Sequence, residues 1–399
     1  MADSPLRILH VVPTYVPAWR YGGPIRSIHG LCRTLARLGH EVHVFTSSLD
    51  GPGELDVPLQ RPVDLDGVRV RYDRPGWPRR LYRYPDLLPA LRAQLATFDL
   101  LHLHGVFLWS TWVGARQAER LGIPYVVSPR GMLVRELIHR RSRLAKTLWI
   151  ELVEKRTLAR AASLHLTSPR EQEDLQQLGL NTAPIRIIPN GIDPPDHVAA
   201  VADMALPAGV LSAPRGFILF LGRINWKKGL DRLIQAFPRV PEGVLVIAGN
   251  DEEGYRSHLE QLIATLRLTN RVFFVGAAHE QQKWGLLRRA RALALTSHSE
   301  NFGNVVLEAM QVGCPVVVTA EVGLASTVAA SACGLVTAGD PEAIADALCH
   351  LLDHPDQAAA WGDNGLRAVR EQFTWEAVGG NMVSLYRELV AGRTRRHQG

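Results

Sequence analysis

The sequence predicts an α/β protein with two doubly wound parallel sheets. Three observations predict this fold class. The chain has 399 residues, which is about the length of two domains. Hydrophobic residues make up 46% of it and charged residues 21%, so there are enough apolar side chains for two cores. Short apolar runs alternate with amphipathic stretches along the chain, and this alternation is typical of βαβ units.

The first βαβ unit is predicted at the start of the chain. The apolar run 7–12 predicts a strand, and the alternating run 41–46 predicts the next one. Between them, apolar residues recur at helical spacing from Ile25 to Ala36. Pro24 suits the first turn of this helix and Gly39 its end. Strand, helix and strand at this spacing imply parallel pairing, with helices covering the sheet.

The same pattern predicts two domains in succession. In the first half we expect further strands at 99–104, 123–128, 163–167 and 185–188, and a hairpin over 60–75. After a turn-rich run, a second series is expected at 217–221, 244–248, 272–275, 292–296 and 315–319. The predicted segments are a first domain over 1–195, a linker over 196–215, a second domain over 216–375, and a last helix and tail over 376–399 that can return to the first domain. Two such domains facing each other would leave a cleft at the carboxyl ends of their strands.

Composition excludes several classes of protein. No apolar run approaches the ~18 residues that a membrane-spanning helix needs. The 4 Cys form no C-x-x-C pair, which argues against a zinc ribbon and favours a reduced, cytoplasmic setting. Residues 1–200 hold 26 Lys and Arg against 19 Asp and Glu, whereas residues 201–399 hold 19 against 20. We therefore expect the first half to face any anionic partner.

Two glycine-containing motifs suggest a phosphate-bearing ligand. Tyr21-Gly22-Gly23-Pro24 follows the first strand and opens a helix, where a backbone can approach an anion closely. Taken alone, paired glycines at a turn are more often structural. In the second half, Gly222 and Arg223 end a strand, and Lys228 follows near the next helix. Arginine can bind a diphosphate with two hydrogen bonds and lysine as a point charge; the alternative is a solvated basic loop.

A third motif places two carboxylates eight residues apart. Glu300 ends the loop after the strand 292–296, and Glu308 falls in the following helix. A carboxylate can accept two hydrogen bonds from a vicinal diol, which suits ribose or a hexose. The backbone N–H groups of residues 301–304 open this helix, so they could also reach a sugar or diphosphate.

These features in this order resemble the glycosyltransferases of the GT-B fold, which have two Rossmann-like domains facing across a cleft. They resemble most closely the large retaining family numbered four, over nearly the whole chain. The matching pieces are Tyr21–Pro24, Asp99–Gly105, Ser128–Met132, Ile188–Asp193, Phe220–Arg223 with Lys228-Gly229, Ile247–Gly249, and Glu300 with Glu308. The last pair matches the family's E-x7-E motif, which is quite specific.

The resemblance implies a role for each matching residue. Arg223 and Lys228 would hold the donor diphosphate and stabilise the leaving phosphate. Glu308 would bind the ribose and Glu300 the transferred sugar. The implied catalytic residues are Glu300, His104, Arg223 and Lys228. The implied donor-binding residues are Gly22, Gly23, Arg223, Lys228, Gly249, Gly276, Glu300, Asn301, Phe302, Gly303, Asn304, Val305 and Glu308. Members of the family retain the anomeric configuration, by a same-face attack in which the departing phosphate assists deprotonation of the acceptor.

Neither of two metal-like patterns is expected to bind a metal ion. His102 and His104 are expected on opposite faces of one strand, so that they could not easily share an ion, with His102 in the core and His104 facing the sugar. Asp64-Leu65-Asp66 matches a D-x-D metal motif, but it precedes a hairpin turn and is interpreted as turn chemistry. Beyond the nucleotide-sugar co-substrate, we expect no cofactor and no metal.

Two basic segments of the first half are candidates for membrane contact. Residues 130–156 hold eight Lys and Arg together with Leu144, Leu148, Trp149, Ile150 and Leu152. Residues 74–84 add Arg74, Trp77, Arg79, Arg80, Tyr82, Arg83 and Tyr84. This mixture suits an anionic lipid surface, and it equally suits a solvated helix face with core residues beneath. Arg130 ends a strand at the expected cleft and is predicted to meet the acceptor.

We therefore expect a retaining hexosyltransferase that moves a sugar from a UDP- or GDP-linked donor to a glycan or lipid-linked glycan acceptor. The expected context is cell-surface polysaccharide or lipopolysaccharide synthesis, in the cytoplasm or peripherally at the inner face of the cell membrane. One alternative is a non-hydrolysing sugar-nucleotide epimerase of the same fold. Another is a catalytically idle partner protein that binds nucleotide sugars. Nucleic acid is not an expected partner, because the basic surplus is modest and the second half is slightly acidic.

Overall fold

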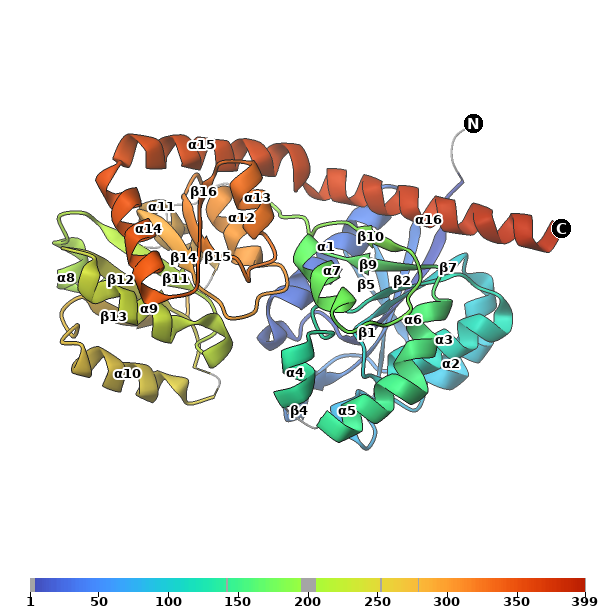
Figure 1. The fold of residues 1–399 in the computed structure, drawn as a ribbon. Helices are drawn as coiled ribbons and strands as arrows, with labels where there is room; N and C mark the ends of the chain where they lie inside the picture. Colours follow the sequence, from blue (N-terminus) through green and yellow to red (C-terminus); the bar gives the residue numbers. More distant parts are fainter. Residues whose placement is uncertain (1–3, 141–142, 195–205, 252, 279, 399) are drawn as a thin grey trace. The chain divides into compact units, whose positions relative to one another are not determined.

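The computed structural model describes residues 4–140, 143–194, 206–251, 253–278 and 280–398 (Figure 1). They form two compact units, Met1–Gly191 with Trp375–Gly399, and Ile192–Thr374. The boundaries between the units fall after Gly191 and after Thr374, whereas the sequence predicts that the first domain ends at residue 195 and the second at residue 375. Residues 196–205 of the predicted linker lie outside the described residues, and its remainder contains the short helix α8 (Ala208–Leu211). Along the part of the chain that the structure describes, no helix is long and apolar enough to cross a membrane.

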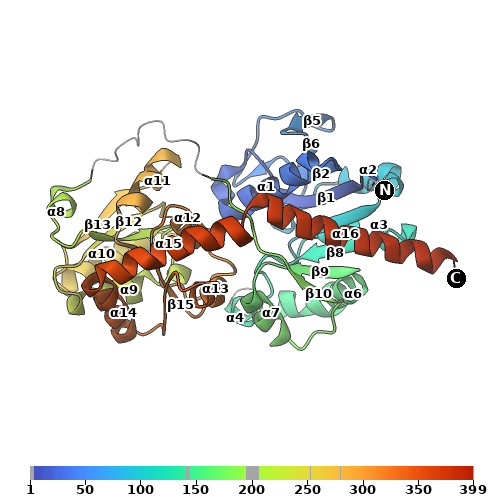
Figure 2. The same ribbon diagram turned by 90° about the horizontal axis from the view of Figure 1, so that it is seen from above.

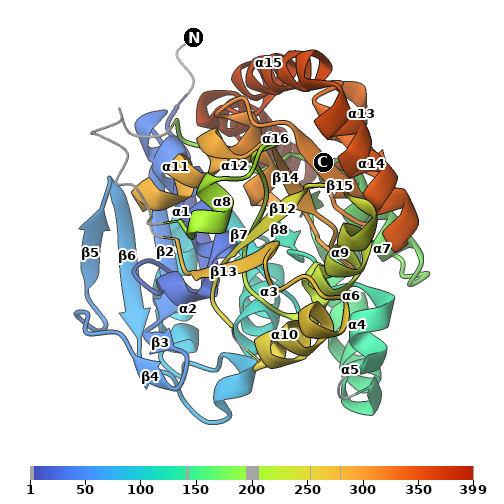
Figure 3. The ribbon, with the colours of Figure 1, turned by 90° about the vertical axis from the view of Figure 1, so that its left-hand side faces the viewer.

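The first unit has an eight-stranded sheet in the order β10-β9-β8-β7-β1-β2-β6-β5. All neighbours are parallel except β5 and β6, which pair antiparallel as the predicted hairpin at one edge (Figure 3). The strands are β1 (Arg7–Thr14), β2 (Glu41–Ser47), β5 (Pro62–Leu65), β6 (Val68–Asp73), β7 (Leu100–His104), β8 (Tyr125–Ser128), β9 (Ser163–Leu166) and β10 (Ile185–Ile187). The strand order reverses between β1 and β7, and doubly wound sheets bind ligands at such a switch point.

Helices cover both faces of this sheet over two apolar cores. They are α1 (Gly23–Arg37), α2 (Leu87–Gln94), α3 (Trp109–Leu121), α4 (Arg135–Arg140), α5 (Arg143–Trp149), α6 (Lys155–Arg160) and α7 (Pro169–Gln176), with a separate small ribbon of β3 (Leu49–Asp50) and β4 (Gly53–Glu54). The last helix, α16 (Trp375–Gln398), lies along α1 (Figure 2). The Trp375 ring packs against Gly30, where an added Cβ would lie 2.1 Å from a ring carbon. The absence of a side chain at Gly30 therefore lets α16 dock on the first unit.

The second unit has a six-stranded, fully parallel sheet in the order β13-β12-β11-β14-β15-β16. Its strands are β11 (Phe217–Leu221), β12 (Val244–Ala248), β13 (Val272–Gly276), β14 (Ala292–Leu295), β15 (Val316–Thr319) and β16 (Gly334–Thr337). Its helices are α9 (Leu230–Ala236), α10 (Tyr255–Thr265), α11 (Glu280–Arg289), α12 (Asn304–Met310), α13 (Ala325–Ala330), α14 (Pro341–Asp353) and α15 (Pro355–Gln372). In chain order the strands run 3-2-1-4-5-6, the Rossmann order, so the switch point lies between β11 and β14. The two parallel α/β sheets confirm the predicted fold class.

Candidate active site

The loops after β11 and β14 meet at the switch point of the second sheet. The turn η5 (Trp226–Lys228) ends at Gly229, whose φ is 61°. An added Cβ there would lie 2.0 Å from the carbonyl oxygen of Thr296, so only glycine lets the turn pack on the loop after β14. Lys228 Nζ then donates to a carboxylate oxygen of Glu300, and both side chains are mostly buried. Two residues predicted from separate motifs are thus brought together.

A buried arginine fixes the loop that leads to Glu300. Arg232 on α9 donates from Nε to the carbonyl oxygen of Thr296 at 2.6 Å, and its Nη2 donates to the carbonyl oxygen of Ser297. Nη2 also donates to Thr319 Oγ1 at 3.3 Å. The Arg232 guanidinium group therefore binds three neighbouring oxygens, two carbonyl and one hydroxyl. Sequence reasoning missed Arg232, because an arginine in an amphipathic helix usually faces solvent.

The second carboxylate of the motif also has a lysine partner. Glu308 lies on α12 and accepts a hydrogen bond from Lys283 Nζ of α11 at 2.9 Å. The same ammonium group lies 4.5 Å from the ring centroid of Trp284. Sequence reasoning missed Lys283 as well, since nothing in its local pattern separates it from a surface lysine.

Three glycines lie at the carboxyl ends of three adjacent strands of the second sheet. Two of them, Gly249 and Gly276, are predicted donor-binding residues, and Gly222 precedes Arg223. Gly222 and Gly249 directly follow β11 and β12, and Gly276 is the last residue of β13. Gly249 donates its N–H to the carbonyl oxygen of Gly276 at 2.8 Å. An added Cβ at Gly249 would lie 1.7 Å from the carbonyl oxygen of Gly222. By contrast, among the described residues other than its chain neighbours, no heavy atom lies within 4 Å of an added Cβ at Gly276. The glycines let the strand ends approach closely and leave the backbone open at Gly276.

The remaining predicted donor residues of the second unit, apart from Arg223, lie on the loop between β14 and α12 or in the first turn of α12. Gly323 packs against this loop so closely that an added Cβ would lie 2.0 Å from the carbonyl oxygen of Asn301. Phe302 is buried, and Gly303 precedes α12 with a φ of 94°. Asn304 and Val305 form the first turn of α12, which has only seven residues. The exception, Arg223, is exposed and directly follows Gly222.

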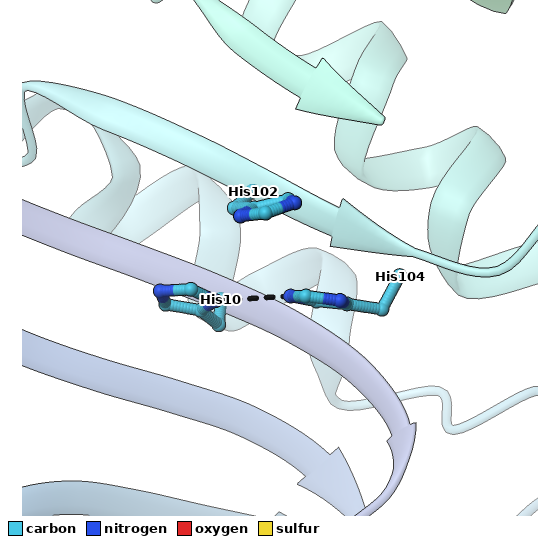
Figure 4. Close-up of side chains that lie close together, drawn as sticks. All are labelled: His10, His102 and His104. Atoms are coloured by element: carbon cyan, nitrogen blue, oxygen red, sulfur yellow. Dashed lines mark hydrogen bonds between the residues drawn. The ribbon is translucent and has the colours of Figure 1, made fainter. Parts of the chain in front are cut away.

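In the first unit, the structure joins His104 and Arg130. His104 ends β7 and is fully buried (Figure 4). Arg130, at the end of β8, donates to His104 Nδ1 at 3.4 Å and to Asn190 Oδ1 at 3.0 Å. A guanidinium group can only donate, so His104 Nδ1 accepts, and Nε2 carries the proton that it donates to His10 Nδ1 at 3.0 Å. Both ring nitrogens of His104 are therefore engaged inside the protein.

The expectation that His102 and His104 point to opposite faces was wrong. Their rings stack at 4.2 Å between centroids, because residues two apart on a strand share a face (Figure 4). The prediction that His102 is a core residue is confirmed: its ring nitrogens lie 2.6 Å from Tyr386 Oη and 2.7 Å from Ser128 Oγ. Burial lowers the pKa of all these rings, to about 3 for His10, helped by the charge of Arg130.

His10, His102 and His104 have ligand atoms within 4.8 Å of one another, close enough to hold a metal ion. However, both nitrogens of His102 and of His104 already have hydrogen-bond partners. An ion would have to break these bonds in a sealed core. The arrangement is that of a neutral, hydrogen-bonded imidazole stack.

Two other motifs of the first unit, Tyr21–Pro24 and Asp64–Asp66, lie at turns. Gly22 has a φ of 70° and precedes α1, which begins at Gly23. Asp64 Oδ1 accepts the N–H of Gly67 at 3.1 Å in the turn between β5 and β6, so the interpretation of the D-x-D match as turn chemistry is confirmed.

The two Rossmann-like units and the paired site at the switch point define a glycosyltransferase of the GT-B fold. Residues 22–191 match the family "Glycosyl transferase 4-like domain", and residues 209–368 match "Glycosyl transferases group 1". The chain belongs to the group 1 glycosyltransferases, as its motifs predicted.

Individual relatives cover nearly the whole chain. It is 29% identical to the D-inositol 3-phosphate glycosyltransferase of Xylanimonas cellulosilytica, over 92% of this chain and 91% of the relative. Among solved structures, the sucrose-phosphate synthase of Thermosynechococcus elongatus matches with a TM-score of 0.78 and 26% identity, over 97% of this chain and all of the other. HepE of Anabaena, in complex with UDP and glucose, matches with a TM-score of 0.68 and 20% identity, over 96% of this chain and all of the other.

Proposed function

We propose that this glycosyltransferase is a retaining hexosyltransferase that uses a UDP- or GDP-linked sugar and extends a glycan or lipid-linked glycan in cell-surface polysaccharide synthesis. The observation that carries the proposal is the Lys228–Glu300 pair at the switch point of the second sheet. It places a cation suited to a diphosphate and a carboxylate suited to sugar hydroxyls on the two loops that doubly wound sheets use for ligands. HepE, which shares the fold, binds UDP and glucose.

The two lysine–glutamate pairs suggest how a donor is bound. Lys228 leaves Glu300 and binds the donor diphosphate, so that the Glu300 carboxylate is released for the hydroxyls of the transferred sugar. Lys283 keeps its bond to Glu308 and orients that carboxylate toward the ribose diol. Arg223 supplies a second cation for the diphosphate. Positive charge fixed at the leaving phosphate stabilises the charge that develops there in the transition state.

In the first unit, we assign the acceptor to Arg130. His104 is buried with both ring nitrogens bonded, which does not fit a side chain that touches a sugar. We therefore propose that His104 is a positioning residue that acts through Arg130, in place of the catalytic role that the resemblance implied. The bond from the anomeric carbon to the donor phosphate breaks, and a departing phosphate oxygen takes the proton of the acceptor hydroxyl. That hydroxyl oxygen bonds to the same face of the sugar, so the configuration is retained without an enzymic nucleophile.

A phosphorylated polyol or sugar is a second candidate acceptor. The relatives named above act on inositol 3-phosphate or form sucrose phosphate, by their names. The half-buried guanidinium of Arg130 would suit such a phosphate, since arginine binds phosphate with two hydrogen bonds. For either acceptor we propose a cytoplasmic enzyme; a lipid-linked one requires peripheral contact with the inner face of the membrane.

A donor and acceptor panel tests the proposal. Purified protein is incubated with UDP- and GDP-hexoses and either lipid-linked glycans or phosphorylated polyols, and the product is analysed by nuclear magnetic resonance. The expected product keeps the anomeric configuration of the donor. Glu300→Ala should abolish transfer, whereas Glu342→Ala, at an exposed salt bridge on α14, should leave it unchanged. An inverted product would contradict the retaining mechanism, and an altered nucleotide sugar formed without acceptor would identify an epimerase.

A further inference from the structure

A row of leucines on the first unit is exposed to solvent. Leu144 and Leu148 lie on α5 and Leu152 on η4 (Ile150–Glu154), and they are 86%, 59% and 66% exposed. They are spaced four residues apart on one uninterrupted helical segment, so they occupy one face of it. Exposed leucines scattered singly are ordinary, but an exposed apolar row marks an interaction surface.

The structure shows which residues of this segment face the core and which face solvent. The core is reached by other residues: Ile150 is buried, and buried Glu154 accepts hydrogen bonds from the N–H of Phe107 at 2.6 Å and from Trp149 Nε1 at 2.8 Å. These contacts anchor the opposite side of the helix. The three leucines are therefore not the core side of a solvated helix, because the core side is already filled.

The charge around the leucines is positive. Residues 135–156, which include all three leucines, contain seven Lys and Arg and three Glu. Among the described side chains, Arg135 is exposed and Lys146 lies 5.8 Å from the ring centroid of Phe107. Leucines on one face with basic residues beside them are typical of helices that lie in the interface of an anionic bilayer.

The second basic segment lies at the same end of the first unit. Trp77 is 84% exposed, and Arg83 donates to its carbonyl oxygen at 2.8 Å. The Arg83 guanidinium lies 5.9 Å from the ring centroid of Trp109, two residues beyond the Phe107 that Lys146 contacts. Arg79 donates to the carbonyl oxygen of Pro52 beside β4. Both β4 and α5 lie toward the lower end of this unit in Figure 1, and Figure 3 shows them on opposite sides of that end. Tryptophan is enriched at membrane interfaces, where its ring sits among the headgroups.

We propose that this surface docks on an anionic lipid bilayer. We call it the leucine face, and it consists of Leu144, Leu148 and Leu152 with the basic residues Arg135 and Lys146. The apolar side chains enter the headgroup region, and the basic ones contact lipid phosphates. A second copy of this chain is a poorer occupant, since two such faces would bring like charges together. The inference deepens the proposed function, on which it rests for a membrane-side acceptor, but its test needs no transfer.

Vesicle flotation tests the leucine face directly. The full chain is mixed with phosphatidylcholine vesicles with or without phosphatidylglycerol, at low and high salt. Wild type should float with the anionic vesicles at low salt. Leu144→Glu/Leu148→Glu should lower the bound fraction about tenfold or more, because each leucine loses its transfer from water to lipid. The matched control is Leu211→Glu, at a leucine that is 62% exposed on α8 of the second unit, and it should float like wild type.

Each other outcome overturns the inference. Wild type that stays unbound, or a double variant that floats like wild type, excludes lipid docking through this face. Light scattering that finds wild-type dimers, and monomers for the double variant, assigns the face to self-association instead. Nucleoside diphosphate binding, measured on the same proteins, reports separately on the proposed function. Wild type that binds nucleotide but does not float overturns only the docking surface, and wild type that floats but does not bind nucleotide overturns only the donor site.

Discussion

The Lys228–Glu300 pair predicts that two neighbouring substitutions change nucleotide affinity in opposite directions. In the structure, Lys228 is already bound to Glu300, so a diphosphate must take the ammonium group from the carboxylate. Lys228→Met removes the cation and should weaken binding of free UDP or GDP. Glu300→Gln removes the charge that competes for Lys228 and should tighten binding of the same nucleotides.

The structure bounds both effects. A hydrogen bond to a charged group contributes about 1.5–3 kcal/mol, so Lys228→Met should weaken binding about 10- to 100-fold. The lower part of this range is expected, because Lys228 loses its bond to Glu300 when it binds a phosphate. Glu300→Gln removes the cost of breaking the Lys228–Glu300 bond, so this variant should bind the nucleotide about threefold to tenfold more tightly than wild type. With Lys228 absent, the Glu300→Gln substitution should add little, since the competition is gone.

Isothermal titration calorimetry with UDP and GDP, without sugar or metal, measures these affinities. The exposed pair Lys155–Glu151 provides matched controls, because Lys155→Met and Glu151→Gln remove the same chemistry elsewhere. Both controls should bind like wild type. If Lys228→Met and Glu300→Gln change affinity in the same direction, or neither changes it, the partner exchange is refuted.

Three further predictions concern residues around the two sites. Lys283→Met should raise the KM for the donor about tenfold with little change in kcat, since Glu308 keeps its charge and loses its orienting bond; steady-state kinetics measures both. Gly249→Ala should lower the free energy of unfolding by about 3 kcal/mol in urea, because its Cβ would meet the carbonyl oxygen of Gly222 at 1.7 Å. Burial raises the pKa of Glu154 to about 7, so this residue stabilises the fold most below about pH 4.5 and loses that contribution as the pH rises through 7. Glu154→Gln should therefore gain about 3 kcal/mol relative to wild type between pH 4.5 and pH 8, measured by urea unfolding at both pH values.

A specific result would contradict each of these three predictions. A Lys283→Met enzyme with unchanged KM would leave Lys283 without a role at the donor. A Gly249→Ala protein as stable as wild type would show that the strand ends can separate at no cost. A stability difference between Glu154→Gln and wild type that does not vary with pH would mean that Glu154 ionises in the fold as it does in the unfolded chain.

Much of the fold could be predicted because it depends on local patterns. The strand runs 7–12, 41–46 and 217–221 alternate with amphipathic helices, and buried parallel strands are apolar on both faces. The edge strand β16 was missed because its sequence Gly-Leu-Val-Thr is half-exposed and forms no apolar run. The end of α16 at Gln398 has no stop signal, since its last residues are polar throughout.

The site was predictable only where a motif carried it. Glu300 and Glu308 share a spacing that can be recognised, and Lys228 follows a strand-ending glycine. Their partners Lys283 and Arg232 come from helices distant in sequence, and only the folded chain shows which carboxylate or carbonyl they face. The stacking of His104 on His102 follows from strand periodicity alone, because residues two apart on a strand share a face. The expectation that the two rings point to opposite faces was therefore contrary to the sequence pattern itself.

Donor binding by the second unit is the central claim, and a thermal-shift screen tests it most directly. The protein is melted with UDP, GDP, ADP and dTDP and their common sugar conjugates, without metal. A ligand at about 100 times its Kd stabilises the folded state by about 2.7 kcal/mol. We expect a clear rise in Tm for UDP or GDP and its conjugates, and a much smaller rise for Lys228→Met. No rise with any nucleotide at millimolar concentration would contradict it.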